Sequence, residues 1–529
     1  MLRTKRSVQV AYPVKRTFEI RPVAGMFDQE PAQEIPLGGS PDMVNCYVLS
    51  GLLRKRPGYA QWKTDNAAIG SSVVGIYSTQ DEENNTHLFA VHPTGLAKYN
   101  SSTLSWDAMT GTALTGGASQ LFSFENSQNS MVFSQGVDQV MRMPFTGSAY
   151  AILNASCPAT KFLTRFADRL FLAYTLESAV SKPFRIRRCV AQDHTDWTGV
   201  GSGFTDLAEF PYHIRQIRKL GTMVAVYTEH NIWFGIRTEQ VASPARFEPK
   251  ITDLGLYAAF TLAGAGETHL FLGNDDIYQL TDAGQLVPVG RQVRDSIFSE
   301  LNAAALAQMF GVTLSDTQEY VCFVCTGSDT TPGKAWVYNW SRQTWYPWTF
   351  SGPKCGTIHR LDDTITIDSL VGTIDAQTWE FDSRLVQAAY PSLLTGHTDG
   401  KIYQWSTTYA ADAGSAISCR WTSKDFTAAD LDPLAEGRQI TLTRLTISYK
   451  DTGASATLSL EYSTDGGNSW SSADSVTLTG SSGGFREVTT WRQVTGNKIR
   501  FRFRHSSATE TFQIAAFYPT LELRGMPIT

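Results

Sequence analysis

The chain has no apolar run long enough to span a membrane as a helix. None of its 529 residues belongs to a stretch of about 18 apolar residues, the length that such a helix requires. The nearest stretch, residues 254–265, is too short and is interrupted by glycines. Basic residues run through the N-terminus with no apolar segment after them, so we expect no secretory signal peptide. We predict a protein without a membrane-spanning segment that is made in a cytoplasm.

Cysteine is scarce in this sequence. The seven cysteines are scattered and odd in number, which favours a reducing compartment and argues against a disulfide framework. Cys322 and Cys325 have the spacing of a metal or redox motif, but positions i and i+3 of a strand point to opposite faces. No second such pair or histidine pair completes four ligands. We expect buried thiols and no metal site.

Catalytic motifs are also missing. Charged residues make up 18% of the chain and the formal net charge is −5, a balance that indicates no particular partner. No histidine lies in an HxH or HExxH spacing, and no serine lies in a GxSxG turn. Carboxylates occur in turns, but the sequence gives no reason to pair two of them across a cleft. We predict that the protein is not an enzyme and needs no cofactor.

What the sequence does contain is a repeated hairpin. A short apolar strand, a polar turn and a second strand that ends in an aromatic or basic residue occur seven times. The paired segments are residues 87–91 and 96–99, 131–133 and 140–142, 169–172 and 184–186, 223–227 and 231–233, 269–272 and 276–278, 320–323 and 335–338, and 392–394 and 401–403. A period of about fifty residues with one hairpin each is typical of a β-propeller, whose blades bury their faces on one another.

We predict an all-β protein in three parts: an extended N-terminal arm at residues 1–65, a β-propeller at 66–411 and a β-sandwich at 412–529. Prolines spaced along the arm prevent a helix there. The propeller has six to eight blades, with seven favoured, because the last gap between hairpins has room for an eighth unit at residues 363–379. One helix is expected where Asp295 and Ser296 cap apolar residues at helical spacing up to Met309.

The C-terminal part has a different pattern. Apolar and polar residues alternate with a period of two, in segments separated by turns rich in glycine and serine, which is typical of a β-sandwich. The predicted strands are residues 416–421, 440–449, 456–462, 485–491, 498–503 and 511–521.

Residues 463–470, with the sequence STDGGNSW, match the Asp-box pattern S-x-D-x-G-x-x-W. In this turn the Asp465 carboxylate is expected to accept amide hydrogen bonds, Gly467 to take a positive φ, and Trp470 to pack beneath the turn. Sialidases and other glycosidases carry several such boxes, one per blade. Here a single box lies in the predicted sandwich, so we assign Asp465, Gly467 and Trp470 a structural role.

A string near the N-terminus resembles a known family. Residues 40–48 (SPDMVNCYV) and 51–59 (GLLRKRPGY) place an asparagine in an extended strand, then a turn and a basic run closed by Pro-Gly. This string is similar to the segment that precedes the propeller in tail hub proteins of short-tailed bacteriophages, often called packaged-DNA stabilisation proteins. Three further stretches, residues 196–228, 255–294 and 463–492, occur in matching order.

The resemblance implies a structural protein of the virion tail that is assembled in the host cytoplasm. Six copies would form a ring, the hub or nozzle, below the portal and the adaptor or head-completion ring. Genomic DNA would pass through the lumen without sequence specificity, and the outer surface would hold tail fibre or spike proteins. A weak negative charge suits a conduit, because a strongly basic lumen would retain DNA by counterion release.

We assign a candidate interface to the arm. Apolar residues there have few local partners in the sequence, so they are expected to pack against a neighbouring subunit, and the basic run to contact another virion protein or subunit. The assigned residues are Met43, Val44, Leu52, Leu53, Arg54, Lys55 and Arg56. On a strand, only Arg54 and Arg56 of the basic run share a face.

Two other functions stay open. One is a carbohydrate-binding or glycosidase-like propeller with an accessory sandwich, which the Asp box and the aromatic residues suggest. The other is a cytoplasmic propeller that acts as a scaffold for protein partners. The extended arm favours the virion protein, because a soluble glycosidase has no use for a long leader spaced by prolines.

Overall fold

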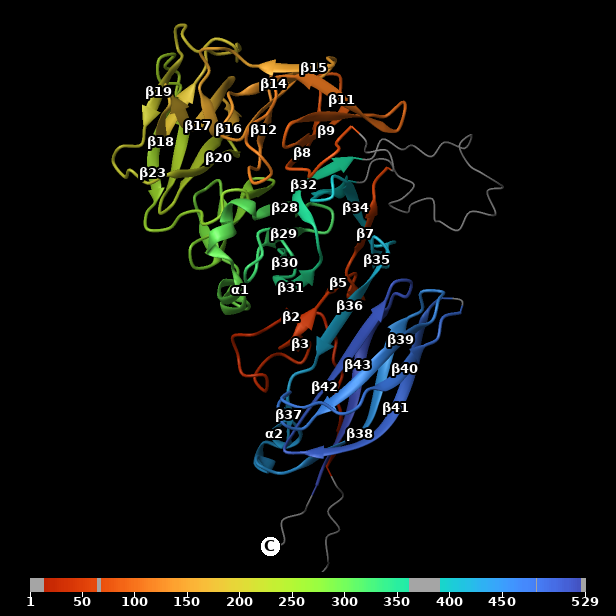
Figure 1. The fold of residues 1–529 in the computed structure, drawn as a ribbon. Helices are drawn as coiled ribbons and strands as arrows, with labels where there is room; N and C mark the ends of the chain where they lie inside the picture. The colour runs from red at the N-terminus through yellow and green to blue at the C-terminus, as the bar shows by residue number, and fades with distance from the viewer. Residues whose placement is uncertain (1–13, 64–67, 361–390, 482, 525–529) are drawn as a thin grey trace, which may run out of the picture. The chain divides into compact units, whose positions relative to one another are not determined.

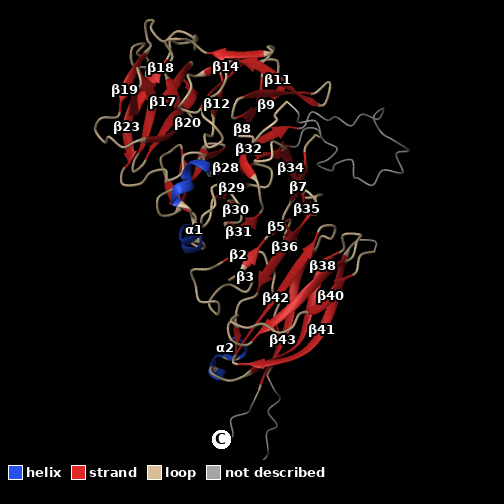
Figure 2. Cartoon of the chain, viewed as in Figure 1, coloured by secondary structure: helices blue, strands red, loops and turns tan. Residues whose placement is uncertain are grey.

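The structure is a computed structural model that describes residues 14–63, 68–360, 391–481 and 483–524. These residues are built mainly of β-strands, and α-helix is confined to α1 (Arg294–Glu300) and α2 (Ala428–Leu431) (Figure 1, Figure 2). The predicted all-β class is confirmed. In the part of the chain that the structure describes, no helix is long and apolar enough to cross a membrane.

Contacts divide the chain into two compact units. The first unit combines the chain up to Pro57 with residues 344–348 and the chain from Ala410 onward, and the second holds residues 58–343 and 349–409. This differs from the predicted three-part division, because the N-terminal arm belongs to the same unit as the C-terminal strands. The reason is strand pairing over long sequence separations, which a local pattern does not reveal.

The second unit is a succession of antiparallel sheets. An eight-stranded sheet has the order β12-β13-β14-β15-β11-β10-β9-β8, in which the parallel pair β11 and β15 joins two antiparallel halves. Four-stranded sheets follow as β16 to β19, β20 to β23 and β24 to β27, then β28-β29-β30, and finally β32-β33-β34-β7.

The strands of this unit have the following bounds: β7 Gly58–Gln61, β8 Gly75–Gln80, β9 Thr86–His92, β10 Gly95–Asn100, β11 Ser105–Gly111, β12 Ser123–Asn126, β13 Ser130–Ser134, β14 Met141–Pro144, β15 Ala149–Ile152, β16 Ala159–Phe166, β17 Arg169–Glu177, β18 Val180–Arg188, β19 Gly203–Asp206, β20 Ile214–Leu220, β21 Met223–Thr228, β22 Ile232–Arg237, β23 Ala245–Ile251, β24 Ala263–Ala265, β25 Thr268–Leu272, β26 Ile277–Thr281, β27 Leu286–Pro288, β28 Phe310–Leu314, β29 Glu319–Val324, β30 Lys334–Asn339, β32 Pro353–Arg360, β33 Pro391–His397 and β34 Ile402–Ser406.

All seven predicted hairpins form. They are the antiparallel pairs β9–β10, β13–β14, β17–β18, β21–β22, β25–β26, β29–β30 and β33–β34. In the β17–β18 turn, Ser178 and Ala179 have φ values of 49° and 64°. Two central residues with positive φ make a turn whose twist matches that of the flanking strands. The predicted eighth unit at residues 363–379 lies outside the described residues.

The first strands of these sheets surround one cavity. Its volume is about 520 Å³, and residues of β8, β12, β16, β20, β24, β28 and β32 line it. The hairpin strands that follow each first strand carry most of the fully buried apolar residues, such as Phe89, Phe133, Phe171 and Phe271. The first strands therefore form the wall of the cavity, while the second and third strands fill the space between sheets.

A strand from the N-terminal region completes the last sheet. β7 pairs with β34, and Tyr59 lies opposite Trp405 in the register. The Tyr59 ring also packs against aromatic neighbours, with its centroid 4.9 Å from Trp405, 5.3 Å from Tyr403 and 5.2 Å from His397. The hairpin β33–β34 thus gains its fourth strand from a segment more than three hundred residues earlier in the chain.

The first unit contains two large sheets and a small parallel sheet of two strands, β2 (Gly25–Met26) and β3 (Gly39–Ser40). One large sheet has the order β41-β38-β43-β6-β5, with β1 paired to β43. In the other, β36, β42, β39 and β40 pair in that order, with β4 paired to β36 and β37 paired to β42. The bounds are β1 Lys15–Thr17, β4 Met43–Val44, β5 Cys46–Leu49, β6 Leu52–Lys55, β36 Ser415–Thr422, β37 Phe426–Thr427, β38 Ile440–Lys450, β39 Ala456–Ser463, β40 Asp474–Leu478, β41 Phe485–Gly496, β42 Lys498–Ser507 and β43 Gln513–Leu523.

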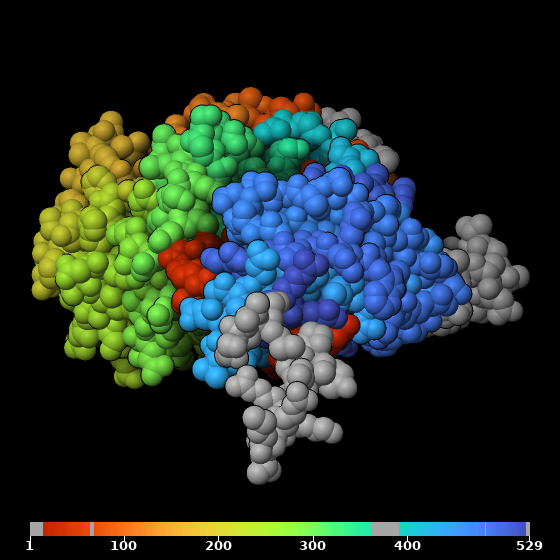
Figure 3. Space-filling model, turned by 90° about the horizontal axis from the view of Figure 1, so that it is seen from below, coloured from red at the N-terminus to blue at the C-terminus, as the bar shows by residue number. Residues whose placement is uncertain are grey.

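Aromatic side chains connect the two large sheets of this unit. Trp421 on β36 stacks on Phe517 of β43, with ring centroids 5.0 Å apart and an interplanar angle of 10°. Phe501 and Phe503 on β42 contact the same phenylalanine at 5.5 and 5.8 Å. All six predicted C-terminal strands form, whereas β40 was not predicted. In Figure 3 atoms of the N-terminal segment, in red, lie next to atoms of the C-terminal part, in blue, in agreement with the pairing of β1 and β6 with β43.

The predicted helix is shorter than expected. α1 begins after Val293, which makes no side-chain cap, and it ends before Leu301. A 3-10 segment follows at Ala303–Gln308. The helix ends because Leu301 bridges to Thr326 and the Asn302 N–H donates to the Cys325 carbonyl, so pairing with a neighbouring segment replaces the helical hydrogen bonds.

We predict that Tyr59→Ala destabilises the second unit by about 3 kcal/mol, because it leaves a cavity among Trp405, Tyr403 and His397. Denaturant unfolding of the full chain measures the change. Val200→Ala is the control, since Val200 is 88% exposed. Equal unfolding midpoints for the two variants would contradict a closing role for β7.

Candidate functional site

The apolar residues of the assigned interface are buried within their own chain. Met43 is 1% exposed, Leu53 0% and Leu52 7%, and Val44 is half-buried. Met43 pairs with Trp421 across β4 and β36, and Leu53 pairs with Ile514 across β6 and β43. The premise that these residues have few partners is therefore wrong. Their assignment as an interface between subunits stays a prediction that a single chain does not test.

The basic run is also held inside the first unit. Lys55 donates from Nζ to the carbonyls of Ser507, at 2.5 Å, and Glu510, at 3.2 Å. Arg56 lies outside β6 and is 2% exposed. Arg54 is half-buried, and burial lowers the pKa of its guanidinium. The predicted shared face of Arg54 and Arg56 is wrong, because the strand ends between them.

Arg56 forms a two-pronged ion pair. Its Nη1 donates to Asp412 Oδ1 at 2.9 Å, and its Nη2 contacts the other oxygen of the same carboxylate. Its Nε donates to Asn45 Oδ1 at 2.9 Å, and Nη1 also reaches the Pro57 carbonyl at 2.8 Å. Such fork-to-fork pairs are strong and directional, so Arg56 fixes the path of the chain just before β7.

Asn45 lies between β4 and β5, so its predicted place in an extended strand is wrong. Its φ is 55°, in the left-handed region that asparagine tolerates better than most residues. Its side-chain amide donates to the Ser418 carbonyl at 2.8 Å, and its backbone N–H donates to the Pro347 carbonyl at 3.0 Å. Asn45 thereby joins β36, residues 344–348 and Arg56 of the first unit.

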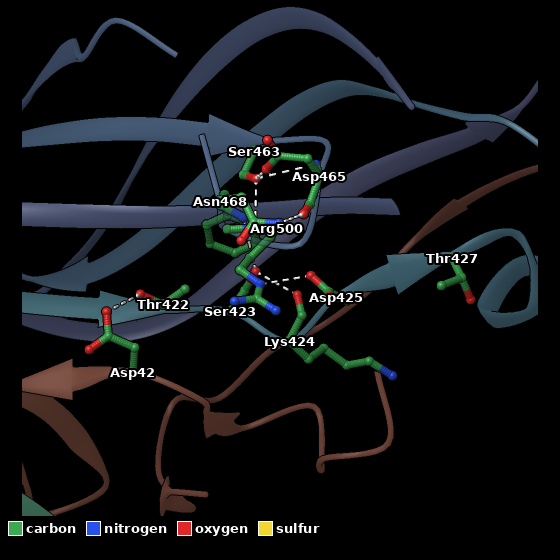
Figure 4. Close-up of polar contacts among 12 residues, drawn as sticks. Asp42, Thr422, Ser423, Lys424, Asp425, Thr427, Ser463, Asp465, Asn468 and Arg500 are labelled. Carbon is green, nitrogen blue, oxygen red and sulfur yellow. Dashed lines mark hydrogen bonds and ion pairs between the residues drawn. The ribbon is translucent and has the colours of Figure 1, made fainter. Parts of the chain in front are cut away.

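Ser40 and Asp42 hold the beginning of the same string to β36. Ser40 Oγ donates to the Thr422 carbonyl at 2.8 Å. Arg420 Nε lies 2.6 Å from Asp42 Oδ2, and Thr422 Oγ1 donates to the same carboxylate at 3.5 Å (Figure 4). The polar residues of the string are thus the contacts that attach it to the C-terminal strands.

The Asp-box turn connects β39 to β40 and forms as predicted. The Ser469 N–H donates to Asp465 Oδ1 at 2.9 Å, and Ser463 Oγ donates to the same oxygen at 2.7 Å (Figure 4). Gly466 and Gly467 have φ values of 76° and 94°, which only glycine adopts without strain. These hydrogen bonds lower the pKa of Asp465 well below its usual range, the Ser469 hydroxyl contributing most.

Trp470 closes the turn from beneath. Its Nε1 donates to the Gly467 carbonyl at 3.0 Å, and the Arg502 guanidinium lies 3.8 Å from its ring centroid. Asp465 itself is exposed, and its oxygens bind groups of its own turn. The geometry is that of a turn-stabilising carboxylate, in agreement with the assigned structural roles of Asp465, Gly467 and Trp470.

A buried ion pair links this turn to the N-terminal segment. A Cβ added at Gly467 would lie 2.8 Å from Arg500 Nη1, so the guanidinium packs directly on the turn. Arg500 Nε donates to Asp425 Oδ1 at 2.7 Å (Figure 4). The Asp425 N–H in turn donates to the Ala32 carbonyl at 2.9 Å. The ion pair thus connects β42 to the N-terminal segment, and the Arg500 guanidinium packs against the turn.

Sequence reasoning missed the charged groups of the cavity in the second unit. Arg218 and Lys219 on β20 and Glu125 on β12 line it, together with Tyr77 on β8. Burial raises the pKa of Glu125, and the Arg165 N–H and the Arg218 charge act in the opposite direction. Perturbed groups that converge on a cavity mark a candidate binding site. The signal was absent from the sequence because these residues lie on first strands, outside the repeated hairpins.

Cys322 and Cys325 are buried, and burial raises the pKa of each thiol to about 12. Within the described ranges, no group of three or more His, Cys, Asp or Glu side chains is placed to hold a metal ion.

No family model matches the sequence, and no curated protein matches it. Among solved structures, the chain is similar to the extracellular domain of a putative hybrid two-component system of B. thetaiotaomicron, with 10% identity, a TM-score of 0.40, and coverage of 67% of this chain and 40% of that one. It is also similar to PorZ, a surface component of the type-IX secretion system of Porphyromonas gingivalis, with 11% identity, a TM-score of 0.33, and coverage of 69% and 42%. This chain spans less than half the length of either structure.

We predict that Arg56→Ser lowers the free energy of unfolding of the first unit by about 3 kcal/mol, because it leaves the Asp412 carboxylate without its partner. Chemical denaturation of the full chain measures the loss. Arg54→Ser is the matched control and should cost less than about 1 kcal/mol. The pair Arg56→Met with Asp412→Leu should recover part of the loss, since no charge is then left alone. The same midpoint for Arg56→Ser and Arg54→Ser would refute the structural role of Arg56.

We predict that Asp465→Asn lowers the melting temperature of the first unit by a few degrees near neutral pH. The carboxylate has a depressed pKa in the folded chain, so its contribution is complete above the pKa of the unfolded chain, about 4, and is lost as pH falls toward the folded value. The difference between wild type and variant should therefore shrink between pH 6 and pH 3. A pH-independent difference would show that the carboxylate charge is not involved.

Proposed function

We propose that this chain is a structural protein of a bacteriophage tail, the hub or nozzle below the portal and adaptor rings. In this role it forms a ring of six copies, retains packaged DNA and conducts it during ejection, and offers its outer surface to fibres or spikes. It has no enzymatic activity, and it is assembled in the host cytoplasm.

The observation that supports the proposal most is that residues 40–59 make structural contacts within the first unit. This string holds the most specific resemblance to tail hub proteins, and its polar residues make the contacts that build the first unit: Ser40 and Asp42 on β36, Asn45 in a left-handed turn, and Arg56 on Asp412. Each of these polar residues makes a specific contact that the fold of the first unit requires. The residues that carry the resemblance are therefore structural ones, which supports a fold shared with the tail hub proteins.

We further propose that the second unit is a seven-bladed β-propeller and that the two large sheets of the first unit form a β-sandwich. Seven first strands around one cavity support seven blades, with β7 completing the last of them. Stacking of Trp421 on Phe517 between the two sheets supports the sandwich.

The cavity bears on how DNA would pass. At about 520 Å³ it has the size of a small-molecule pocket and cannot admit a duplex. The lumen of the proposed hub must therefore be enclosed by several chains. Met43, Leu52 and Leu53 are buried within their own chain. The surfaces that join those chains therefore include residues other than the ones assigned to the arm.

The second candidate is a carbohydrate-binding or glycosidase-like propeller. The Asp-box turn motivated it, but the Asp465 oxygens are engaged by Ser463 and Ser469 of the same turn. This geometry favours a folding role over catalysis. A glycan-cleaving activity that Asp465→Ala abolishes, with an unchanged melting curve, would promote this candidate.

We predict that the purified full chain forms a ring of six subunits. Light scattering after size exclusion measures the mass, and negative-stain micrographs show the symmetry. A mass of 58.3 kDa, that of one chain, with no ring on the grids at any protein concentration tested would contradict the proposal.

We predict that Arg54→Ser impairs attachment of the hub to the ring above it without unfolding the chain, because Arg54 is the half-buried member of the basic run. Virion assembly with the variant hub measures attachment, and a melting curve checks the fold. Normal virion assembly with this variant would show that Arg54 is not part of the interface.

A further inference from the structure

The cavity of the second unit contains one guanidinium, that of Arg218, which donates a hydrogen bond from only one of its three nitrogens to the described part of the chain. Arg218 lies on β20 and is exposed to the cavity that β8, β12, β16, β20, β24, β28 and β32 line. Its Nη1 donates to the Leu262 carbonyl at 3.0 Å. In the described part of the chain, no acceptor binds Nε or Nη2. These two atoms form one edge of the guanidinium, and their N–H groups match the two oxygens of a carboxylate.

The strand that carries Arg218 is held by a buried polar chain. The Tyr227 hydroxyl bonds to His269 Nδ1 at 2.8 Å, and His269 Nε2 lies 3.0 Å from the Lys219 carbonyl. Burial lowers the pKa of His269 to about 3, so the imidazole is neutral, donates from Nε2 and accepts at Nδ1. The backbone next to Arg218 is thereby fixed from β21 and β25, which positions the guanidinium in advance of binding.

Space is left beside the open edge of Arg218. A Cβ added at Gly264 would lie 3.9 Å from Nη2 and 4.0 Å from Nε, which is ordinary contact. The absence of a side chain at this position therefore leaves the cavity free next to the fork. A larger side chain would occupy the place where a ligand's oxygens would lie.

The remaining walls combine positive charge with apolar surface. Lys219 adds a second cation, and Glu125 contributes the one carboxylate among the lining residues. That carboxylate already accepts hydrogen bonds from Thr164 Oγ1, at 3.3 Å, and the Arg165 N–H, at 3.1 Å. The rings of Tyr77 and Phe124 stack at 5.2 Å and line the cavity with Phe260 and Phe310.

We propose that this cavity binds a small organic carboxylate, with the acid group on Nε and Nη2 of Arg218 and the apolar body against the aromatic wall. The cavity volume of about 520 Å³ is in the range of small-molecule sites. The inference goes beyond the proposed tail function and does not depend on it.

Titration calorimetry on the full chain tests the proposal with phenylacetate as the probe and phenylacetamide as its uncharged analogue. Phenylacetate should bind about tenfold or more tightly than the amide, since hydrogen bonds to charged groups are worth that much. Arg218→Gln should weaken phenylacetate binding by a similar factor, and Arg218→Lys should not restore it, because lysine lacks the fork. Arg237→Gln, an exposed arginine that does not line this cavity, is the matched control.

Gly264→Leu separates loss of the site from loss of the fold. This variant keeps Arg218 and fills the space beside it, so phenylacetate binding should disappear while the melting curve stays close to that of wild type, and Gly264→Ala should have a smaller effect. Equal binding of acid and amide, or phenylacetate binding that survives both Arg218→Gln and Gly264→Leu, would overturn the proposal. Inorganic phosphate binding as tightly as phenylacetate would also overturn it, since the site would then recognise only charge.

Discussion

The pairing of β7 with β34 is the constraint on which the second unit depends. The successive sheets of this unit bury their faces against one another. Without β7, the last sheet would end in an open edge with unpaired N–H and C=O groups. β7 supplies the missing strand, and Tyr59 anchors it among Trp405, Tyr403 and His397. Arg56, two residues before the start of β7, is fixed by Asp412 and Asn45 in the first unit. One short segment thus supplies necessary contacts to both units.

Much of the fold could be predicted from local patterns. The seven hairpins were recognisable because each is an apolar strand followed closely by its partner, and the C-terminal strands because they alternate with a period of two. The Asp-box turn was predictable for the same reason, since Ser463, Asp465 and Ser469 bond to one another within seven residues. Short-range signals such as these survive in any tertiary context.

What could not be predicted depends on pairing between distant residues. β7, β4 and β6 are too short to show a pattern, and β34, β36 and β43, with which they pair, lie more than three hundred residues away. A local pattern therefore predicts an interface with a neighbouring subunit at Met43 and Leu53, whereas both side chains are buried within their own chain. Arg218 lies in the resembling stretch 196–228, but no local pattern marks it as a binding residue. Its importance comes from Gly264 and Leu262, which the fold brings beside it.

The central claim is that the N-terminal segment is an integral part of the folded chain and not a free arm. Amide hydrogen exchange of the full native chain tests it most directly, because the Gly58 N–H donates to the Tyr409 carbonyl and the Trp62 N–H to the Ile402 carbonyl. We expect these two amides, with the other amides of β7, which ends just before Trp62, to exchange as slowly as those of β34, through global unfolding only. Exchange of Gly58 and Trp62 at the rate of an unstructured peptide, while β34 stays protected, would contradict the account.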